Sequence, residues 1–164
     1  MRGWLFFLLL LVAGCGSSPP ADVVTRSGEP DVVRVQGEDV RLEEARRAAC
    51  AALPEFVSAL QSADKTQKRF SLKAEFTEGK VHEFLWLRDI KPEGSDFIGT
   101  LSNQPIQLKK LELGQRLRVK TPAVTDWMYI KNGVLVGGYT IRILAETLTP
   151  EARANLEKEG GFRL

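Results

Sequence analysis

The stretch that decides the fold is DWMYIKNGVLVGGYTIR, residues 126–142. Asn132-Gly133 separates two apolar runs, and this dipeptide favours the type I′ turn of a tight β-hairpin. A two-residue turn places Lys131 opposite Val134 and so sets the register of both strands. The pattern therefore predicts two antiparallel strands over residues 125–144.

The predicted hairpin has two chemically different faces. One is almost entirely apolar and is expected to lie in the core: Asp126, Met128, Ile130, Leu135, Gly137, Tyr139, Ile141 and Ile143. The other mixes aromatic residues with Lys, Thr and Arg, which is typical of a partly exposed surface. Because Trp, Tyr and Arg dominate interface hot spots, four of its members form a candidate recognition patch: Trp127, Tyr129, Lys131 and Arg142. The alternative is structural, with the ring of Trp127 covering Gly138 across the strands.

Outward from the hairpin, the hydrophobic period changes along the chain. Apolar residues at helical spacing between Leu42 and Leu60 predict a helix that Asp39 caps and that is kinked or restarted at Pro54. Alternation then predicts strands at 70–76, 81–90, 97–101, 106–108 and 113–120, with a further short strand at 31–36.

The run at 81–90 is apolar on both sides, so it is expected to be a central strand. Thr149-Pro150-Glu151 predicts the start of a C-terminal helix that ends at Gly160-Gly161. The predicted fold class is α+β, with a kinked N-terminal helix, a mostly antiparallel sheet of about five to seven strands and a short C-terminal helix.

The N-terminus has the features of a cleavable export signal. Arg2 precedes the apolar run WLFFLLLLV at 4–12, which is shorter than the ~20 residues that span a bilayer. The following segment, Leu11-Val12-Ala13-Gly14-Cys15, resembles the lipobox of bacterial lipoproteins. This resemblance implies cleavage before Cys15, diacylglycerol on its thiol and usually a fatty acid such as palmitate on the new amine. An ordinary secretory signal with an incidental cysteine is the alternative.

These features divide the chain into a signal peptide at 1–14, a lipid-anchored flexible tether at 15–38 and a globular domain at 39–164. Two or more acyl chains anchor a protein stably to a bilayer. The expected location is therefore the cell envelope. In a Gram-negative source, Gly16 after the cysteine implies the periplasmic face of the outer membrane, by resemblance to other lipoproteins.

Charge excludes a nucleic-acid partner. The chain has 23 Lys and Arg against 21 Asp and Glu, a net charge of +2, and loss of Arg2 with the signal leaves +1. Binding to a phosphate backbone needs a much denser cationic surface. Cys50 lies in an Ala-rich helical segment and is expected to be a buried, inert thiol.

Short motifs across residues 38–164 resemble the YegJ-like domain family of unknown function. They are Leu53-Pro54-Glu55-Phe56, a strand from Phe70 to Phe76, Glu83-x-x-Trp86, Gly99-Thr100-Leu101-x-Asn103-x-Pro105, Asp126-Trp127-Met128-Tyr129 and Gly137-Gly138-Tyr139-Thr140-x-Arg142. The last two are the most specific. The family pattern often has His after the Glu of Glu-x-x-Trp, where this chain has Phe84, so chemistry of that His would not carry over. The resemblance implies a fold and no activity.

The sequence carries no strong catalytic or metal-binding motif. His82 is the single histidine, and a hydrolytic zinc helix would need a second His where Trp86 stands. No metal or other cofactor is therefore expected. Glu83 and Asp126 could act as paired carboxylates. The alternative is structural, with Glu83 paired to Arg or Lys and Asp126 capping a turn.

The leading hypothesis is a non-catalytic, lipid-anchored domain that binds another envelope component, most simply a protein. One alternative is a hydrolase that acts on cell-wall or peptide substrates through Glu83 or Asp126. Another is an immunity or stress protein that masks a toxin, which rests on family analogy. A pocket holding either carboxylate with a shifted pKa would favour the hydrolase, and an aromatic surface would favour binding.

Overall fold

The computed structural model describes residues 22–26, 29–34 and 40–164. A helix pair, a six-stranded sheet and a second helix pair follow one another along the chain, so the predicted α+β class is confirmed. The elements of this domain are α1 (Val40–Ala51), α2 (Leu53–Gln61), β3 (Gln67–Glu78), β4 (Val81–Glu93), β5 (Asp96–Leu101), β6 (Arg116–Val119), the 3-10 turn η1 (Thr121–Ala123), β7 (Val124–Lys131), β8 (Val134–Gly137), α3 (Tyr139–Thr147) and α4 (Pro150–Gly160).

A separate two-stranded antiparallel hairpin, β1 (Asp22–Arg26) and β2 (Glu29–Arg34), precedes the domain. It lies within the segment predicted to be a flexible tether, and β2 overlaps the short strand predicted at 31–36. Cys15, the signal peptide and the predicted cap Asp39 lie outside the described residues.

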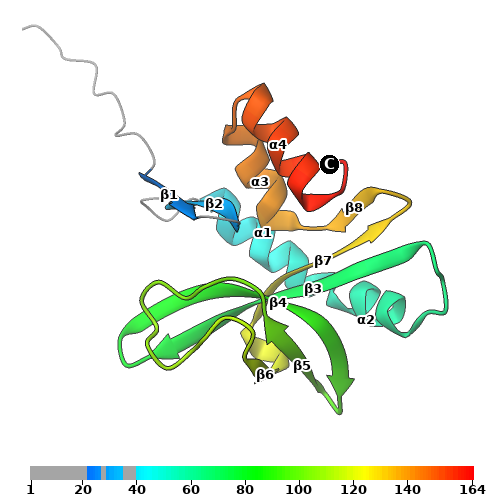
Figure 1. Ribbon diagram of the computed structural model, residues 1–164. Coiled ribbons are helices and arrows are strands. Elements are labelled where there is room, and N and C mark those ends of the chain that lie inside the picture. The colour runs from blue at the N-terminus through cyan, green and yellow to red at the C-terminus, as the bar shows by residue number, and fades with distance from the viewer. Residues whose placement is uncertain (1–21, 27–28, 35–39) are drawn as a thin grey trace, which may run out of the picture.

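The six strands pair in the order β6-β5-β4-β3-β7-β8, and every pair is antiparallel. The predicted central position of β4 is confirmed. Helices α3 and α4 lie together beside β8, far from β5 and β6 (Figure 1). The two C-terminal helices are therefore at the β8 end of the sheet.

The main core lies on one face of the sheet. Directly paired residues share a face and successive residues alternate between faces. The buried positions of β3 to β6, apart from Ser71 opposite Met128 of β7, follow this rule: Leu72, Ala74, Leu85, Leu87, Ile90, Phe97, Gly99, Leu101 and Val119. Phe56 of α2 packs into this layer, with its ring centroid 5.6 Å from that of Trp127. Burial of these apolar side chains is the main source of stability.

A second, smaller core lies under the C-terminal helices. It consists of Ile130, Leu135 and Phe162, with Met128, Ile141 and Leu156 packed against them. The C-terminal residues also pair with β8, since Leu135 N–H donates to the Arg163 carbonyl at 2.8 Å and Arg163 N–H to that of Gly133 at 2.8 Å. The β8 edge of the sheet is thereby covered by the chain's own tail.

Both predicted helix boundaries are confirmed. The N-terminal helix is interrupted after Ala51, and α2 has Pro54 in its first turn. Proline is tolerated there because the backbone N–H that it lacks would have no acceptor within the helix. Helix α4 begins after Thr149, whose Oγ1 accepts from Ala152 N–H at 3.2 Å. It ends at Gly161, which has a φ of 64°.

Two predicted strands are wrong. Residues 139–147 form helix α3, because Gly137 and Gly138 both take positive φ values, 72° and 63°, that end the strand. Residues 106–108 form a loop, because the carboxylate of Glu83 binds their backbone N–H groups. The predicted hairpin register holds from Lys131 opposite Val134 to Met128 opposite Gly137.

The approach of Trp127 to Gly137 gives a test of this packing. A Cβ at Gly137 would lie 2.4 Å from the Trp127 carbonyl oxygen and 2.5 Å from its ring atom Cε3. Gly137→Ala should therefore add a steric cost of ~1–3 kcal/mol to the ~1–2 kcal/mol that a positive φ costs an L-residue. Urea unfolding would measure the loss.

Gly79→Ala is the matched control, because Gly79 has a φ of 63° and nothing within 4 Å of the added Cβ. It should show only the conformational cost. Equal losses for the two variants would contradict the tight contact between Gly137 and Trp127.

Candidate functional site

The surface patch predicted on the hairpin is not present. Trp127 is 0% exposed and Tyr129 is 5% exposed, and the indole Nε1 of Trp127 donates to the Ala49 carbonyl at 2.8 Å. Arg142 lies on α3, where its Nε and Nη2 donate to the Gly137 and Leu135 carbonyls. Lys131 pairs with Asp64 at 3.5 Å. The prediction failed because alternation along a strand does not show which face the helices cover.

The alternative prediction, in which the Trp127 ring covers a glycine of the neighbouring strand, is correct, but the glycine is Gly137 and not Gly138. Its ring lies against Gly137, whereas Gly138 donates its N–H to the Trp127 carbonyl at 2.7 Å and begins α3. Trp127 is thus a core residue that the glycine pair accommodates.

Asp126 is a buried carboxylate that joins β7 to the start of α3. Its Oδ1 accepts from the N–H groups of Trp127 at 2.8 Å and Tyr139 at 3.1 Å. Its Oδ2 accepts from Thr140 N–H at 2.8 Å and from the Thr140 hydroxyl at 2.6 Å. Burial raises the pKa of Asp126, while these hydrogen bonds and nearby Lys73 oppose that rise. The expected capping role is confirmed, at a helix start rather than a turn.

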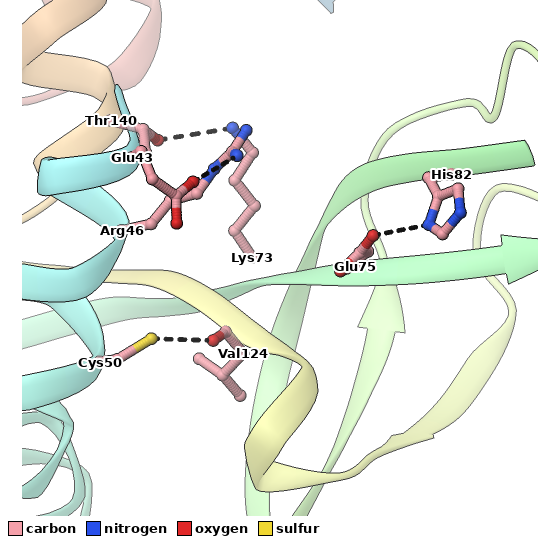
Figure 2. Close-up of polar contacts among 8 residues, drawn as sticks. All are labelled: Glu43, Arg46, Cys50, Lys73, Glu75, His82, Val124 and Thr140. Atoms are coloured by element: carbon pink, nitrogen blue, oxygen red, sulfur yellow. Dashed lines mark hydrogen bonds and ion pairs between the residues drawn. The ribbon is translucent and has the colours of Figure 1, made fainter. Parts of the chain in front are cut away.

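Lys73 is half-buried on β3, close to this carboxylate. Figure 2 shows its side chain reaching toward Thr140, whose Oγ1 lies 3.4 Å from Nζ, with Arg46 of α1 beside it. Burial lowers the pKa of the Lys73 ammonium, Asp126 opposes this change and Arg46 adds to it. The lysine Nζ also lies 5.7 Å from the centroid of the Trp86 ring.

Glu83 and Asn103 hold the long loop between β5 and β6 against β4. The Glu83 carboxylate accepts from the N–H groups of Ile106 at 2.8 Å and Gln107 at 3.1 Å. Asn103 Oδ1 accepts from Trp86 N–H at 2.8 Å. Pro105 is buried between these contacts. Glu83 therefore binds backbone amides instead of the Arg or Lys that the sequence suggested, and these motif residues have a structural role.

The described helices reach the other face of β3 to β6 where Arg46 of α1 contacts Phe84 and Thr140 of α3 contacts Lys73, and we call this face the open face. Its residues are all exposed or half-buried and are paired across the strands: Lys73, Glu75, Thr77, His82, Phe84, Trp86, Arg88, Lys91, Ile98, Thr100, Arg116 and Arg118. Phe84 and Trp86 lie side by side along β4 on this face. The open face is the candidate functional site because it presents aromatic rings among cationic groups.

Cationic groups lie over both aromatic rings. The Arg46 guanidinium carbon is 4.0 Å from the centroid of the Phe84 ring, and its Nη1 lies 3.2 Å from Glu43 Oε2. At the far end of the face, His82 is exposed near the β3–β4 turn, with its Nδ1 2.7 Å from Glu75 Oε1 (Figure 2). The two rings are thus held in place by neighbours from β3 and α1.

Sequence reasoning included Trp86 in a motif but did not identify the surface on which it lies. The signal was available in the run at 81–90. Its residues alternate between a mixed aromatic and charged set (His82, Phe84, Trp86, Arg88) and a mostly apolar one (Val81, Glu83, Leu85, Leu87).

Cys50 is exposed, contrary to the expectation of a buried thiol. Its Sγ lies 3.2 Å from the Val124 carbonyl (Figure 2), and partial burial, with Asp126 and Glu43 nearby, raises its pKa. Cys50 borders a groove of about 540 Å³ between α2 and the β4–β5 turn. The groove contains neither Glu83 nor Asp126, so it is not the pocket that the hydrolase hypothesis required.

In the described part of the chain, no three His, Cys, Asp or Glu side chains are placed to hold a metal ion. Nor is any helix of residues 40–164 long and apolar enough to cross a membrane.

The lowered pKa of Lys73 predicts a specific pH dependence. Between its lowered folded pKa and the usual 10.5, the unfolded chain binds more protons at Lys73 than the folded chain. This group therefore makes the protein more stable as pH rises through that window. Lys73→Met should remove this contribution, so the stability of the variant relative to the original chain should fall as pH rises through the window that ends at the usual 10.5.

Urea unfolding at a series of pH values would measure this difference, with Lys65→Met as an exposed control that should show no such trend. A pH-independent difference for Lys73→Met would mean that burial does not lower this pKa.

Comparison with known proteins supports the family resemblance. The uncharacterized protein YegJ of Escherichia coli K12 is 36% identical over 87 residues, which are 53% of this chain and 57% of that protein. A putative ankyrin repeat protein of Neisseria meningitidis serogroup B is 32% identical over 85 residues, 52% of this chain and 34% of that protein. The matching part of the chain thus spans less than two thirds of either relative, and no enzyme family is indicated. No solved structure matches.

A family model covers residues 39–164, which is nearly the whole domain that the structure describes. It agrees with the resemblance found from the motifs at Glu83 to Trp86 and Asp126 to Arg142. The chain therefore belongs to the family described as uncharacterized proteins conserved in bacteria, DUF2314.

Proposed function

We propose that this chain is a lipid-anchored, non-catalytic binding domain of the bacterial cell envelope, and that its open face contacts a protein partner. The observation that carries this proposal is the pair of half-buried rings, Trp86 and Phe84, that lie beside cationic side chains on the open face. Tryptophan and arginine are the residues that most often dominate binding energy at protein interfaces. Half-buried rings that their neighbours already fix lose little conformational freedom on binding.

The state of the carboxylates supports a non-catalytic domain. Each oxygen of Asp126 accepts two hydrogen bonds, and the residue is 0% exposed. Glu83 is occupied by the amides of the loop that it holds. A general acid or base must come within hydrogen-bond reach of its substrate. Buried Asp126 does not meet this condition without opening the start of α3, and Glu83 would have to release the amides of the loop that it holds.

The lipobox-like segment ending at Cys15 supports the proposed anchor. Two or more acyl chains would hold the domain stably at one membrane. Anchoring raises the effective concentration of a partner in the same membrane, so modest affinity at the open face would be sufficient.

Replacement of Cys15 by Ser tests the anchor. The variant should lose the lipid and leave the membrane fraction, because a serine hydroxyl cannot form the thioether. Immunoblotting of membrane and soluble fractions after cell lysis, with metabolic labelling by a radioactive fatty acid, would measure both effects. Cys50→Ser is the matched control and should keep both label and location. Unchanged labelling of Cys15→Ser would exclude lipidation at this residue.

Substitution of Trp86 tests the binding surface. Trp86→Ala should weaken the interaction with the envelope partner by ~2 kcal/mol or more, which is about 30-fold in affinity. Quantitative mass spectrometry after co-purification from detergent-solubilised envelopes would measure the loss. Leu113→Ala, which removes an exposed apolar side chain in the β5–β6 loop, is the control.

Circular dichroism would establish that both variants remain folded, and Arg88→Glu gives a second substitution on the open face that removes no buried atoms. Retention of the same partners by Trp86→Ala and Arg88→Glu would contradict the proposal.

A further inference from the structure

We infer that Asn132, at the tip of the β7–β8 hairpin, is a site of spontaneous deamidation, and that its isoaspartate product releases the C-terminal tail, residues 162–164, from β8. The reaction concerns the ageing of the protein and is independent of the proposed binding function. The sequence of the turn, the few contacts that hold it and the position of the tail each support it.

The reaction needs only the chain itself and water. The backbone nitrogen of Gly133 attacks Cγ of the Asn132 side chain, so that an N–Cγ bond forms while the Cγ–NH₂ bond breaks. The proton that Gly133 loses completes the departing group, which leaves as ammonia. The resulting succinimide then takes up one water molecule. Opening at Cγ gives aspartate, and opening at the backbone carbonyl carbon gives isoaspartate, in which the main chain runs through the side chain.

The turn presents both reacting groups without protection. Asn132 is exposed, and its carboxamide has no hydrogen-bond partner among the described residues. No described residue accepts a hydrogen bond from Gly133 N–H either. Glycine has no Cβ to hinder attack by its nitrogen, and a Cβ built at Gly133 would meet nothing within 4 Å. The two residues are therefore open to reaction.

Few contacts hold the tip of the hairpin. Outside the β7–β8 ladder, two backbone hydrogen bonds fix residues 132 and 133. Asn132 N–H donates to the Thr66 carbonyl at 3.2 Å, and Arg163 N–H donates to the Gly133 carbonyl at 2.8 Å. Local opening at a loop tip costs much less free energy than global unfolding. The rotation that brings Cγ to the Gly133 nitrogen can therefore take place in a chain that is otherwise folded.

The other two asparagines of the chain, Asn103 and Asn155, lack these features. Asn103 is followed by Gln104, and its Oδ1 accepts from Trp86 N–H at 2.8 Å. Asn155 is exposed but lies inside α4 and is followed by Leu156. The backbone N–H groups inside a helix are bound to carbonyls one turn earlier. Both residues therefore serve as controls within the same molecule.

Isoaspartate changes the turn because it adds one carbon to the main chain. A two-residue turn sets the register of a hairpin through its exact backbone geometry, so the longer link displaces the Gly133 carbonyl. That carbonyl is the acceptor for Arg163 N–H, and the Arg163 carbonyl in turn accepts from Leu135 N–H at 2.8 Å. Loss of the first bond therefore releases the second, and the outer edge of β8 becomes unpaired.

Incubation of the full chain, purified in detergent, in mildly alkaline buffer tests the modification. Mass spectrometry after digestion at acidic pH, which limits deamidation during handling, would follow each asparagine. Asn132 should convert to aspartate and isoaspartate, and methylation by protein isoaspartate methyltransferase should detect the second product. Asn103 and Asn155 should keep their carboxamides over the same time. Conversion of Asn132 no faster than that of Asn155 would overturn the inference.

Hydrogen exchange of the aged chain tests the release of the tail. The amides of Leu135 and Arg163 should lose protection in proportion to the isoaspartate formed. The amide of Leu101, which donates to the Gln115 carbonyl at 2.8 Å in another part of the sheet, should keep its protection. Unchanged protection of Leu135 and Arg163 in the isoaspartate form would overturn the proposed release.

Two substitutions at the same position separate the added carbon from other effects of incubation. Asn132→Gly removes the reacting carboxamide and keeps a dipeptide that favours the same turn, so its tail amides should stay protected after the same treatment. Freshly prepared Asn132→Asp has the charge of the aspartate product without a longer main chain, and it should also keep them protected. Loss of protection at Leu135 and Arg163 in either variant would contradict the isoaspartate mechanism.

Discussion

The carboxylate of Asp126 is the interaction on which the rest of the structure depends. It binds the backbone of its own strand through Trp127 and the first turn of α3 through Tyr139 and Thr140. The two ends of the β7–β8 hairpin are thereby closed into one unit, with the ring of Trp127 against Gly137. Such a buried group is costly unless every lone pair is used. Its surroundings meet that requirement, and they also direct α3 and α4 over the hairpin instead of over the rest of the sheet.

This placement of the helices leaves the sheet unequally covered. The faces of β7 and β8 are packed on both sides, by Phe56 and Tyr129 on one side and by the Ile130 cluster on the other. The strands from β3 to β6 carry the core on one side, and on the other they are contacted by Arg46 of α1 at Phe84 and by Thr140 of α3 at Lys73. Glu83 and Asn103 hold the β5–β6 loop against β4 and fix the backbone of Trp86. Glu83, a candidate catalytic carboxylate, thus stabilises the fold together with Asn103. The strands that they hold carry the aromatic and cationic side chains of the open face.

Local signals in the sequence predicted much of this fold. Asn132-Gly133 identified the hairpin turn, Thr149 and Gly161 the limits of α4, and alternation the central strand β4. Helix α3 was missed because Tyr139 to Ile143 alternate like a strand, and only hydrogen bonds from Asp126, distant in sequence, show that a helix begins there. The burial of Trp127 was also inaccessible to pattern reasoning, since two alternating faces become distinct only when helices cover one of them.

The pairing of Arg163 with the β8 edge affects how copies of the domain can interact with one another. An uncovered strand edge is a template on which another copy can add and so begin aggregation. Here the C-terminal tail occupies one edge. The other edge is the four-residue β6, whose Arg116 and Arg118 would place like charges next to each other in a symmetric pairing. Copies of the domain packed densely on a surface would therefore remain separate, and each sheet would stay available to a different protein.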